Sequence, residues 1–266
     1  MNDINNSIPQ IIHFCWFGKG RYSDMIAECM SSWSRELPNY QVMVWNEDTF
    51  DVNQYDFTRE AYECKKWAFV SDFVRLYALK EYGGIYMDTD VEVIRDFSNI
   101  IAGKKFVSSF TEGGLIATSF VAASKNHPFV CELMKYYEKR HFCDENNNMD
   151  MLMNPIIFTR IAMQMYGLDI TGDSFHNDEV SIFPSEYFQP YRKNNFGSSR
   201  LHSKYHITSN TYVIHKDAGS WSQGQCGLLW IKAAFRLFLP EKVYVAMKRV
   251  KNKKILNCKG IGENQL

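Results

Sequence analysis

The chain has 266 residues, of which 45% are hydrophobic and 15% aromatic, a composition that favours a folded globular protein over a disordered one. Its 30 basic and 30 acidic residues give a formal net charge of zero, which argues against a general nucleic-acid binder. The seven cysteines form no Cys-x-x-Cys pair, and the chain has neither a signal-peptide pattern nor an apolar run long enough to span a bilayer. We therefore expect no disulfide framework, no structural zinc site and a reducing cytoplasmic compartment.

The first 45 residues predict a strand, a helix and a second strand. Residues 8–17 are a β-rich run that ends at Gly18, so we expect a buried strand there. Residues 23–37 have helical spacing, with Ser23 as the N-cap, and residues 40–45 form the next predicted strand. This order is typical of the start of an open α/β sheet.

Helical spacing returns over residues 67–82, and Gly83-Gly84 marks the expected end of that helix. Two further helices are predicted at 127–141 and 150–166, the second interrupted by Pro155. The remaining predicted strands follow at 85–87, 105–110, 115–122, 180–183 and 212–215. Residues 167–179 and 189–210 carry no clear pattern and receive no assignment.

Residues 83–90 read Gly-Gly-Ile-Tyr-Met-Asp-Thr-Asp, and Asp88 and Asp90 are the strongest functional signal in the chain. At a strand end, these two side chains point to one side while Thr89 points to the other. Two such carboxylates repel each other unless a cation or a donor lies between them. Oxygen ligands suit magnesium or manganese, which share phosphate oxygens. We therefore predict a metal site that holds a diphosphate; the alternative is a pair of solvated turn aspartates.

Asp72 and Arg75 lie three residues apart on the predicted helix 67–82, so both project from one side near its start. As a functional pair, Asp72 would accept hydrogen bonds from a ribose or sugar hydroxyl, and Arg75 would contact sugar or phosphate. As a structural pair they would form a surface ion pair. The nearby Asp88-x-Asp90 motif favours the functional interpretation.

A late segment that runs from Tyr212 to Trp221 offers groups that could complete this site. A strand ending in His215, followed by a Gly-Ser-Trp loop, supplies a further metal ligand, His215 or Ser220. Trp221 adds an indole donor to phosphate. The alternative is a structural histidine with a capping tryptophan, and the residues alone favour neither interpretation.

Together these motifs resemble a known family, the retaining glycosyltransferases of the GT-A fold whose sugar-binding region contains a DXD motif. The nearest groups are the yeast-type initiating mannosyltransferases, the bacterial capsule and lipopolysaccharide transferases, and the large glucosylating toxins. The resemblance is best over residues 8–125 and returns at 212–222. It is carried by Trp16 with Gly18, Ser71-Asp72-x-x-Arg75, Gly83-Gly84-x-Tyr86-x-Asp88-x-Asp90 and Ser220-Trp221.

The resemblance implies a fold and a set of roles. The fold is α/β, a GT-A type open mixed sheet flanked by helices, which makes a Rossmann-like nucleotide-sugar-binding domain with helical additions. Asp72 and Arg75 would bind the donor sugar, Asp88 would reach the ribose or a metal-bound water, and Asp90 would be the main protein ligand of Mn²⁺ or Mg²⁺. The remaining donor-binding residues would be Trp16 stacked on the base, Phe17, Tyr86 beside the ribose, and Ser220 and Trp221 closing over the metal and diphosphate.

One further motif departs from the family's pattern. Asn154-Pro155-x-x-x-Thr159 stands where relatives often have Gly-Pro-x-x-x-Thr. Because Asn154 replaces a glycine, no role on the acceptor side follows from the resemblance at this position.

We therefore predict a metal-dependent retaining glycosyltransferase that uses a nucleoside-diphosphate sugar, a UDP-linked hexose or N-acetylhexosamine. Its acceptor would be a glycan or lipid-linked saccharide of bacterial capsule, lipopolysaccharide or another surface polysaccharide. No general base stands out, so the resemblance implies that the leaving phosphate takes the acceptor proton. The alternatives are a metal-dependent nucleotide-sugar hydrolase, which would need a further cluster to activate water, and a binding protein without transfer.

The charge is unevenly distributed along the chain. Residues 226–266 carry nine Lys or Arg and two Glu, a net of +7, so residues 1–225 carry −7. We predict one catalytic domain over residues 1–240 and a basic tail over 241–266. The tail is either a last core helix with a solvated end or an interfacial element that meets anionic lipid. A lipid-linked acceptor would favour the second, with the protein peripheral on the inner membrane face.

Overall fold

The computed structural model describes residues 7–170, 174–193, 204–216 and 241–257. Within them, seven strands form one mixed sheet in the order β2-β1-β3-β6-β5-β8-β7. The pairs β2–β1, β1–β3 and β5–β8 are parallel and the other three are antiparallel. In chain order the strands are β1 Ile11–Cys15, β2 Gln41–Trp45, β3 Gly84–Met87, β5 Phe106–Ser109, β6 Phe120–Ala123, β7 Phe175–His176 and β8 Val180–Phe183. The predicted class, an open mixed α/β sheet flanked by helices, is confirmed.

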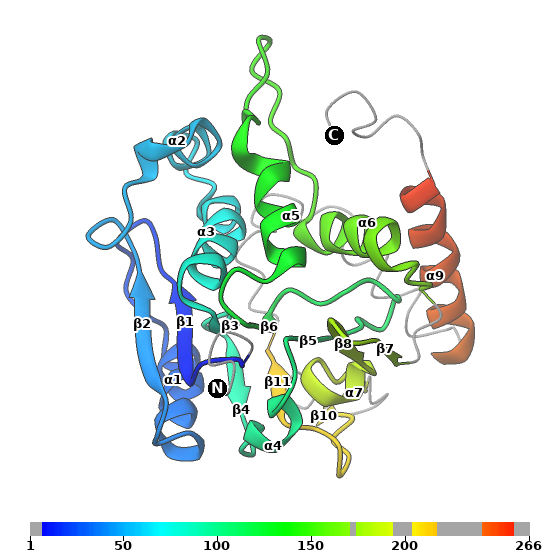
Figure 1. Cartoon of the computed structure of the whole chain (residues 1–266). Coiled ribbons are helices and arrows are strands. Elements are labelled where there is room, and N and C mark those ends of the chain that lie inside the picture. Colours follow the sequence, from blue (N-terminus) through cyan, green and yellow to red (C-terminus); the bar gives the residue numbers. More distant parts are fainter. Residues whose placement is uncertain (1–6, 171–173, 194–203, 217–240, 258–266) are drawn as a thin grey trace, which may run out of the picture.

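Helices cover both faces of this sheet (Figure 1). They are α1 Asp24–Glu36, η2 Val52–Gln54, α2 Asp56–Glu63, α3 Trp67–Tyr82, α4 Ser98–Ile101, α5 Pro128–Glu138, α6 Asn154–Tyr166, α7 Ser185–Phe188 and α9 Glu241–Asn257. Two short antiparallel pairs complete the described structure: β4 Val91–Val93 with β11 Val213–His215, and β9 Arg192–Lys193 with β10 Lys204–Tyr205.

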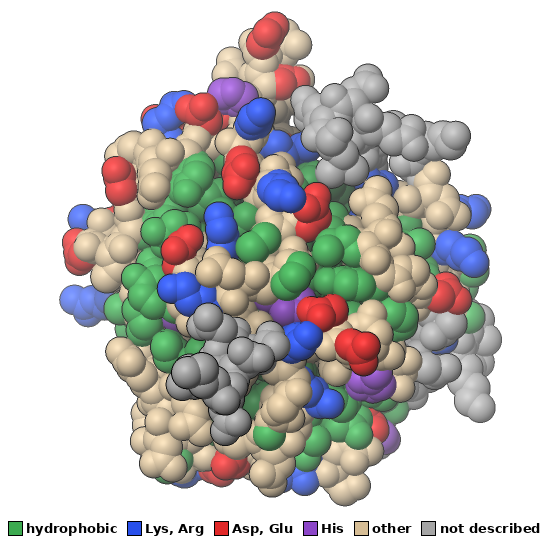
Figure 2. Space-filling view, in the orientation of Figure 1, with side chains coloured by type: hydrophobic (Ala, Val, Ile, Leu, Met, Phe, Trp, Pro, Cys, Tyr) green, Lys and Arg blue, Asp and Glu red, His purple; other side chains and the backbone are tan. Residues whose placement is uncertain are grey.

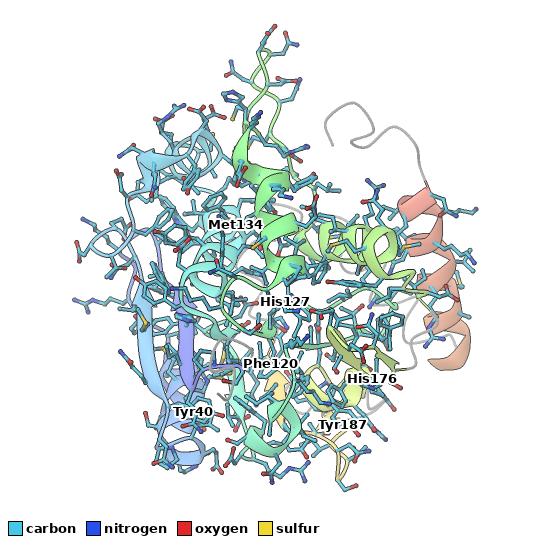
Figure 3. The ribbon with its side chains drawn as sticks, in the orientation of Figure 1. Tyr40, Phe120, His127, Met134, His176 and Tyr187 are labelled. Atoms are coloured by element: carbon cyan, nitrogen blue, oxygen red, sulfur yellow. The ribbon has the colours of Figure 1, made fainter. Side chains whose placement is uncertain are left out.

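The hydrophobic core is divided by the sheet into two clusters. The larger cluster lies against α2, α3, α5 and α6 and includes Met134, whereas the smaller lies against α1, α4 and α7 and includes Phe120 (Figure 3). Phe120 stacks on Phe188 of α7 with a ring-centroid distance of 4.2 Å. Because both faces are buried, the strands are largely apolar rather than alternating. On the surface, acidic and basic side chains are interspersed in the view of Figure 2, consistent with a net charge of zero.

The predicted strand–helix–strand opening is confirmed. Ser23 caps α1 by accepting a hydrogen bond from the Ile26 backbone N–H, which satisfies one donor at the helix start. On the buried side of α1, the Trp33 indole donates to the Val91 carbonyl at 2.7 Å. This bond ties α1 to the start of β4, three residues after Asp88 in the chain.

Two predicted elements have different bounds. The helix expected over residues 150–166 begins at Asn154, and the prediction that Pro155 interrupts it is wrong. Pro155 lies in the first turn, where a backbone N–H has no intrahelical acceptor, so proline costs nothing there. The strand expected over 115–122 begins only at Phe120. Before it, Ile116 makes an isolated β-bridge with Phe110, and its N–H donates to the Thr159 hydroxyl of α6.

The Gly83-Gly84 pair turns the chain from α3 into β3. Gly83 caps α3 with a φ of +66° and Gly84 follows with +108°, values that side chains rarely adopt. A Cβ on Gly84 would lie 2.5 Å from the Ile11 carbonyl oxygen of the neighbouring strand. The two glycines therefore allow β3 to enter the sheet directly beside β1, which places the residues after β3 next to the end of β1.

His13 is a buried histidine whose two ring nitrogens are both occupied. Its Nε2–H donates to the Gly83 carbonyl at 2.8 Å, and its Nδ1 accepts from the Trp45 indole at 3.2 Å. Burial lowers the pKa of His13 to about 4, although the hydrogen bond to Gly83 opposes the shift. The neutral ring is thus part of the junction between β1, β2 and the Gly83 turn.

We predict that His13 weakens the fold in acid. Because its folded pKa lies below the unfolded value, the unfolded state binds the additional proton as pH falls from 6.5 towards 4, so stability is lost across that window. The loss from this one group is on the order of 3 kcal/mol. NMR titration of the His13 ring should give a pKa near 4; titration near 6.5 would contradict the prediction.

Candidate functional site

Asp88 and Asp90 lie in the turn that joins β3 to β4. The Val91 N–H donates to the Asp88 carbonyl at 3.0 Å, which closes the turn, and the Asp88 N–H donates to the Ser119 carbonyl at 2.9 Å. The motif therefore lies at the end of β3, as predicted, but in a turn rather than in the alternating β geometry from which the direction of its side chains was inferred. The two carboxylates nevertheless meet at one histidine.

That histidine is His215, which is brought to the motif by strand pairing. In the β4–β11 pair His215 lies opposite Val91, so its ring reaches back over the turn. His215 Nε2 is 3.2 Å from Asp90 Oδ1 and 3.9 Å from Asp88 Oδ2. One ligand atom from each of these three residues lies within 4.8 Å of the other two. Two carboxylates and an imidazole are a donor set that suits Mn²⁺ and can accommodate Mg²⁺, so these residues fit a divalent cation.

The guanidinium of Arg75 lies at the centre of the neighbouring polar cluster. Its Nη2 is 2.9 Å from Asp72 Oδ1 and 3.4 Å from Asp88 Oδ1, and its Nη1 donates to the Thr118 carbonyl at 3.1 Å. The guanidinium also lies over the Tyr86 ring, 4.6 Å from the centroid. Arg75 is only 5% exposed, so the interpretation of Asp72 and Arg75 as a surface ion pair is wrong.

Burial sets the protonation of this cluster. It raises the pKa of Asp72 to about 7, with Arg75 opposing the shift and Asp88 adding to it. It also raises the pKa of Tyr86 well above the usual value, so the phenol keeps its proton and donates to Asp88 Oδ1 at 2.8 Å. Asp88 is consequently held on one oxygen by Tyr86 and Arg75, while its other oxygen faces His215.

Asn154 is a member of this cluster that sequence reasoning did not assign. It is 2% exposed at the start of α6. Its Oδ1 lies 3.5 Å from Arg75 Nη1, and its Nδ2 donates to the Tyr137 hydroxyl at 2.8 Å. The one feature of the sequence that pointed to this position was the asparagine that stands where relatives often have glycine. The structure places the changed residue against Arg75.

The loop after β1 carries the predicted base-binding residues. Trp16 is half-buried, its indole donates to the Gly20 carbonyl at 2.8 Å, and its ring centroid is 4.6 Å from that of Tyr22. Phe17 is 6% exposed and packs edge-on against Phe50. The indole of Trp16 is thus held in a fixed orientation, whereas Phe17 belongs to the core in this structure.

Cys15 connects this loop to the polar cluster. It ends β1, directly before Trp16, and lies beside Arg75 and Tyr86; burial raises its pKa to about 12. The structure therefore brings together Asp72, Arg75, Tyr86 and Asp88, places Asp90 and His215 next to Asp88, and puts Trp16 at the end of the adjoining strand. Ser220 and Trp221 lie outside the described residues.

The segment that carries most of this site matches a known family model. Residues 23–107 match the family described as "glycosyltransferase sugar-binding region containing DXD motif", a span that begins at the α1 cap and includes Asp72, Arg75, Asp88 and Asp90. The match confirms the resemblance drawn from the motifs over this segment, which is similar to the sugar-binding region of DXD glycosyltransferases.

Two relatives come from fission yeast, Schizosaccharomyces pombe. Inositol phosphoceramide mannosyltransferase 1 is 24% identical over 220 residues, and inositol phosphoceramide mannosyltransferase 3 is 25% identical over 133 residues. These alignments cover 66% and 48% of this chain, but only 65% and 37% of the relatives. The chain thus spans less than two thirds of either relative.

Among solved structures, "PaToxG Glycosyltransferase" is similar with a TM-score of 0.48 and 19% identity, covering 60% of this chain and 70% of that one.

Proposed function

We propose that this protein is a metal-dependent retaining glycosyltransferase that takes its sugar from a nucleoside-diphosphate sugar. The observation that carries the proposal is the convergence of Asp88, Asp90 and His215 within 4.8 Å, beside the buried Asp72–Arg75 pair. A diphosphate donor explains why a metal-binding trio should adjoin a set of groups that can hold sugar hydroxyls. The donor we propose is a UDP-linked hexose or N-acetylhexosamine.

The residues of the proposed metal site have different roles. A divalent cation bound there supplies Lewis-acid stabilisation of the diphosphate leaving group. Asp90 and His215 would hold it from the β3–β4 turn and from β11, with Asp88 Oδ2 as the third ligand. Arg75 and Tyr86 occupy Asp88 Oδ1, and so orient the carboxylate for that task. Outside the described residues, Ser220 and Trp221 remain proposed contacts of the metal and the diphosphate.

Asp72 and Arg75 have separate proposed roles. Each of the three guanidinium nitrogens of Arg75 donates to protein: Nε to the Ser71 carbonyl, Nη1 to the Thr118 carbonyl and Nη2 to Asp72. Arg75 therefore acts mainly by positioning Asp72 and Asp88. Asp72, which receives that N–H on Oδ1, would accept the sugar hydroxyl on its other oxygen. Trp16 would stack on the base, as its fixed indole favours.

The proposed acceptor is a glycan or a lipid-linked saccharide of bacterial surface polysaccharide synthesis. The two fission-yeast relatives are named as mannosyltransferases of inositol phosphoceramide, which supports a hexose donor and an acceptor that carries a lipid. A nucleoside-diphosphate mannose is accordingly the first donor to test beside the UDP-linked sugars. The leaving phosphate would take the acceptor proton, because the described site offers no separate carboxylate that the metal and sugar do not already use.

Measuring donor consumption separates the three candidate activities. The purified chain is incubated with a nucleoside-diphosphate sugar and Mn²⁺, with and without saccharide acceptors. A transferase consumes donor faster when the correct acceptor is present and yields a glycosylated product. A hydrolase consumes it equally without acceptor, and a binding protein consumes none. Acceptor-independent consumption with no transfer product would overturn the proposal.

We also propose that α9 meets an anionic membrane surface. Its inner side is docked on the protein: Lys248 pairs with Glu112 at 3.3 Å, and Asn252 donates to the Gly113 carbonyl at 2.9 Å. Its outer side exposes Met247 and Val250 at 55% and 57%. Lys251, Lys253 and Lys254 of that helix are exposed as well.

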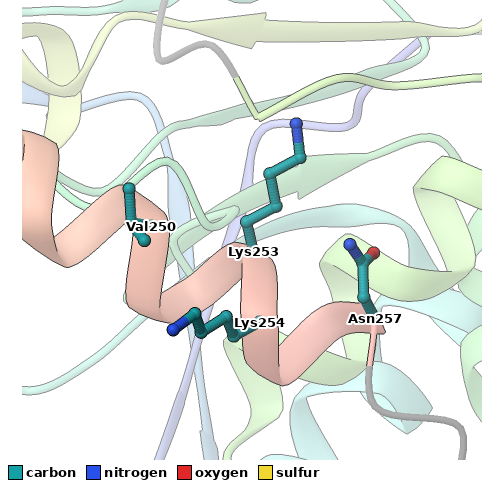
Figure 4. A pocket seen from close by; sticks show the side chains of 4 residues that line it. All are labelled: Val250, Lys253, Lys254 and Asn257. Carbon is teal, nitrogen blue, oxygen red and sulfur yellow. The ribbon is translucent and has the colours of Figure 1, made fainter.

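This arrangement has the charge and the apolar groups of an interfacial helix. Val250, Lys253, Lys254 and Asn257 line an open pocket of about 510 Å³ on α9, and Figure 4 shows how these four side chains lie. The two lysines would meet a phosphate headgroup there. None of the helices within the described residues combines the length and apolar character that crossing a bilayer would take. The proposed contact is therefore with the surface of the membrane.

We predict that this contact depends on these three lysines of α9. Each lysine near an anionic surface contributes about 1 kcal/mol, so changing Lys251, Lys253 and Lys254 to glutamate should reduce binding to anionic liposomes at least about tenfold. Sedimentation with anionic and neutral liposomes measures the effect.

The matched control makes the same change in net charge elsewhere, at the exposed Lys125, Lys135 and Lys139. It should retain most of the binding. Equal and negligible sedimentation of the unaltered chain with both kinds of liposome would contradict the proposed membrane contact.

A further inference from the structure

Two cysteines that are distant in the sequence have side chains in van der Waals contact. Cys64 ends α2, and Cys143 lies in the hairpin between α5 and α6, 79 residues further along the chain. Their Sγ atoms are 3.6 Å apart. A disulfide bond has an S–S distance of about 2.05 Å, so the two sulfur atoms need to approach each other by roughly 1.5 Å.

Contacts between α2 and the hairpin hold these two cysteines close together. The carboxylate of Glu60, one turn before Cys64 on α2, accepts the N–H groups of Phe142 and Cys143 at 2.8 and 3.1 Å. Phe142 is buried and packs edge-on against Phe57 of the same helix, with ring centroids 5.5 Å apart. Figure 1 shows this hairpin rising beside α2. The hairpin is therefore anchored to α2 at the residue that carries the second thiol.

The pair is also accessible, in contrast to Cys15 and Cys29. Cys64 is exposed and Cys143 half-buried, whereas Cys15 and Cys29 are buried. Burial and the adjacent Cys64 sulfur raise the pKa of Cys143 to about 11, so little Cys143 thiolate is present at neutral pH. Since the thiolate is the reactive form, Cys64 is the thiol that an oxidant in solution meets first.

We propose that Cys64 and Cys143 form a reversible intramolecular disulfide when the protein meets a disulfide oxidant such as oxidised glutathione. The Cys64 thiolate attacks one glutathione sulfur, and the first glutathione leaves as a thiolate. Cys143, deprotonated in the second exchange, attacks Cys64 Sγ in the mixed disulfide and releases the second glutathione. The two protein thiols are oxidised by two electrons, oxidised glutathione is reduced to two thiols, and the protein's two protons pass to them through solvent.

The bond would join the two segments that frame the polar cluster. Cys64 lies just before α3, which carries Asp72 and Arg75, and the Cys143 hairpin leads into Asn154 of α6, which contacts Arg75. Cross-linking distant positions removes conformational freedom from the unfolded chain. We therefore expect the oxidised form to be more stable, with α3 and the start of α6 held together.

The test uses the full chain under reducing conditions and after oxidised glutathione. Free thiols are then alkylated and peptides are mapped by mass spectrometry. We expect a Cys64–Cys143 linked peptide lighter by two hydrogens, and a Tm that rises by several degrees and returns with dithiothreitol. Cys64→Ser should lose both effects, and Cys131→Ser, which alters a half-buried cysteine elsewhere, should keep both.

Three results would overturn the proposal. One is recovery of Cys64 and Cys143 as separately alkylated residues after oxidation. Another is a lasting glutathione adduct on Cys64 with no cross-link. The third is a cross-link from either residue to a different cysteine. Because the readout is the bond itself, the outcome is independent of whether the protein transfers sugar.

Discussion

Asp90→Ala is expected to abolish metal-supported sugar transfer, with a loss of at least about a hundredfold, the scale of removing a main charge stabiliser. The reason is geometric. Asp90 Oδ1 lies 3.2 Å from His215 Nε2, so its removal takes one of the three ligands from the site. Initial rates at saturating donor and Mn²⁺ measure the loss.

The control for this variant is Asp178→Ala, which removes an exposed carboxylate at the β7–β8 turn and should leave the rate unchanged. Asp88→Asn should be nearly as severe as Asp90→Ala, because it alters the oxygen that faces His215. Chelation of the unaltered protein should reproduce both losses. Full activity in excess EDTA would remove the metal from the mechanism.

Asp72→Asn is expected to stop turnover of the sugar nucleotide while leaving affinity for the free nucleoside diphosphate largely intact. The oxygen of the asparagine amide can still accept a hydrogen bond from Arg75, so the buried cluster keeps its arrangement. The second carboxylate oxygen, which would accept the sugar hydroxyl, is replaced by an NH₂ group. Comparing kcat/KM with the Kd of the nucleoside diphosphate separates the two effects.

A matched control is Glu81→Gln, the same chemical change near the other end of α3, which should retain wild-type rates. If Asp72→Asn also turns over at the wild-type rate, the Asp72–Arg75 pair has only a structural role. A loss of nucleotide affinity equal to the loss of rate would instead place Asp72 at the diphosphate.

Local sequence patterns predicted the elements that position the site. The helix over residues 67–82 and its end at Gly83 were predicted with the observed bounds, because apolar spacing and a glycine cap are properties of adjacent residues. The same holds for Asp88 and Asp90, which are separated by one residue. Their turn was left as an alternative, since the contact of the Asp88 N–H with the Ser119 carbonyl joins residues that are distant in the sequence.

Long-range contacts account for what the sequence left open. The proposed role of His215 as a metal ligand depends on its position opposite Val91 in the β4–β11 pair, which local spacing does not predict. Asn154 gave a local signal only by differing from glycine, and its contact with Arg75 joins residues 79 positions apart. The cysteine count predicted no disulfide framework, and the approach of Cys64 to Cys143 depends on Glu60, which no spacing rule connects to either.

Thermal shift with nucleotide sugars tests the central claim most directly. The chain is heated with UDP-, GDP- and CMP-sugars in Mn²⁺, and again after EDTA; a ligand that binds the folded state raises Tm by mass action. We predict a rise in Tm with a diphosphate sugar that EDTA removes and Asp90→Ala lacks, and little or no rise with the monophosphate CMP-sugar. A rise that persists in EDTA, or none with any diphosphate sugar, would contradict a site in which a divalent cation holds a nucleoside-diphosphate sugar.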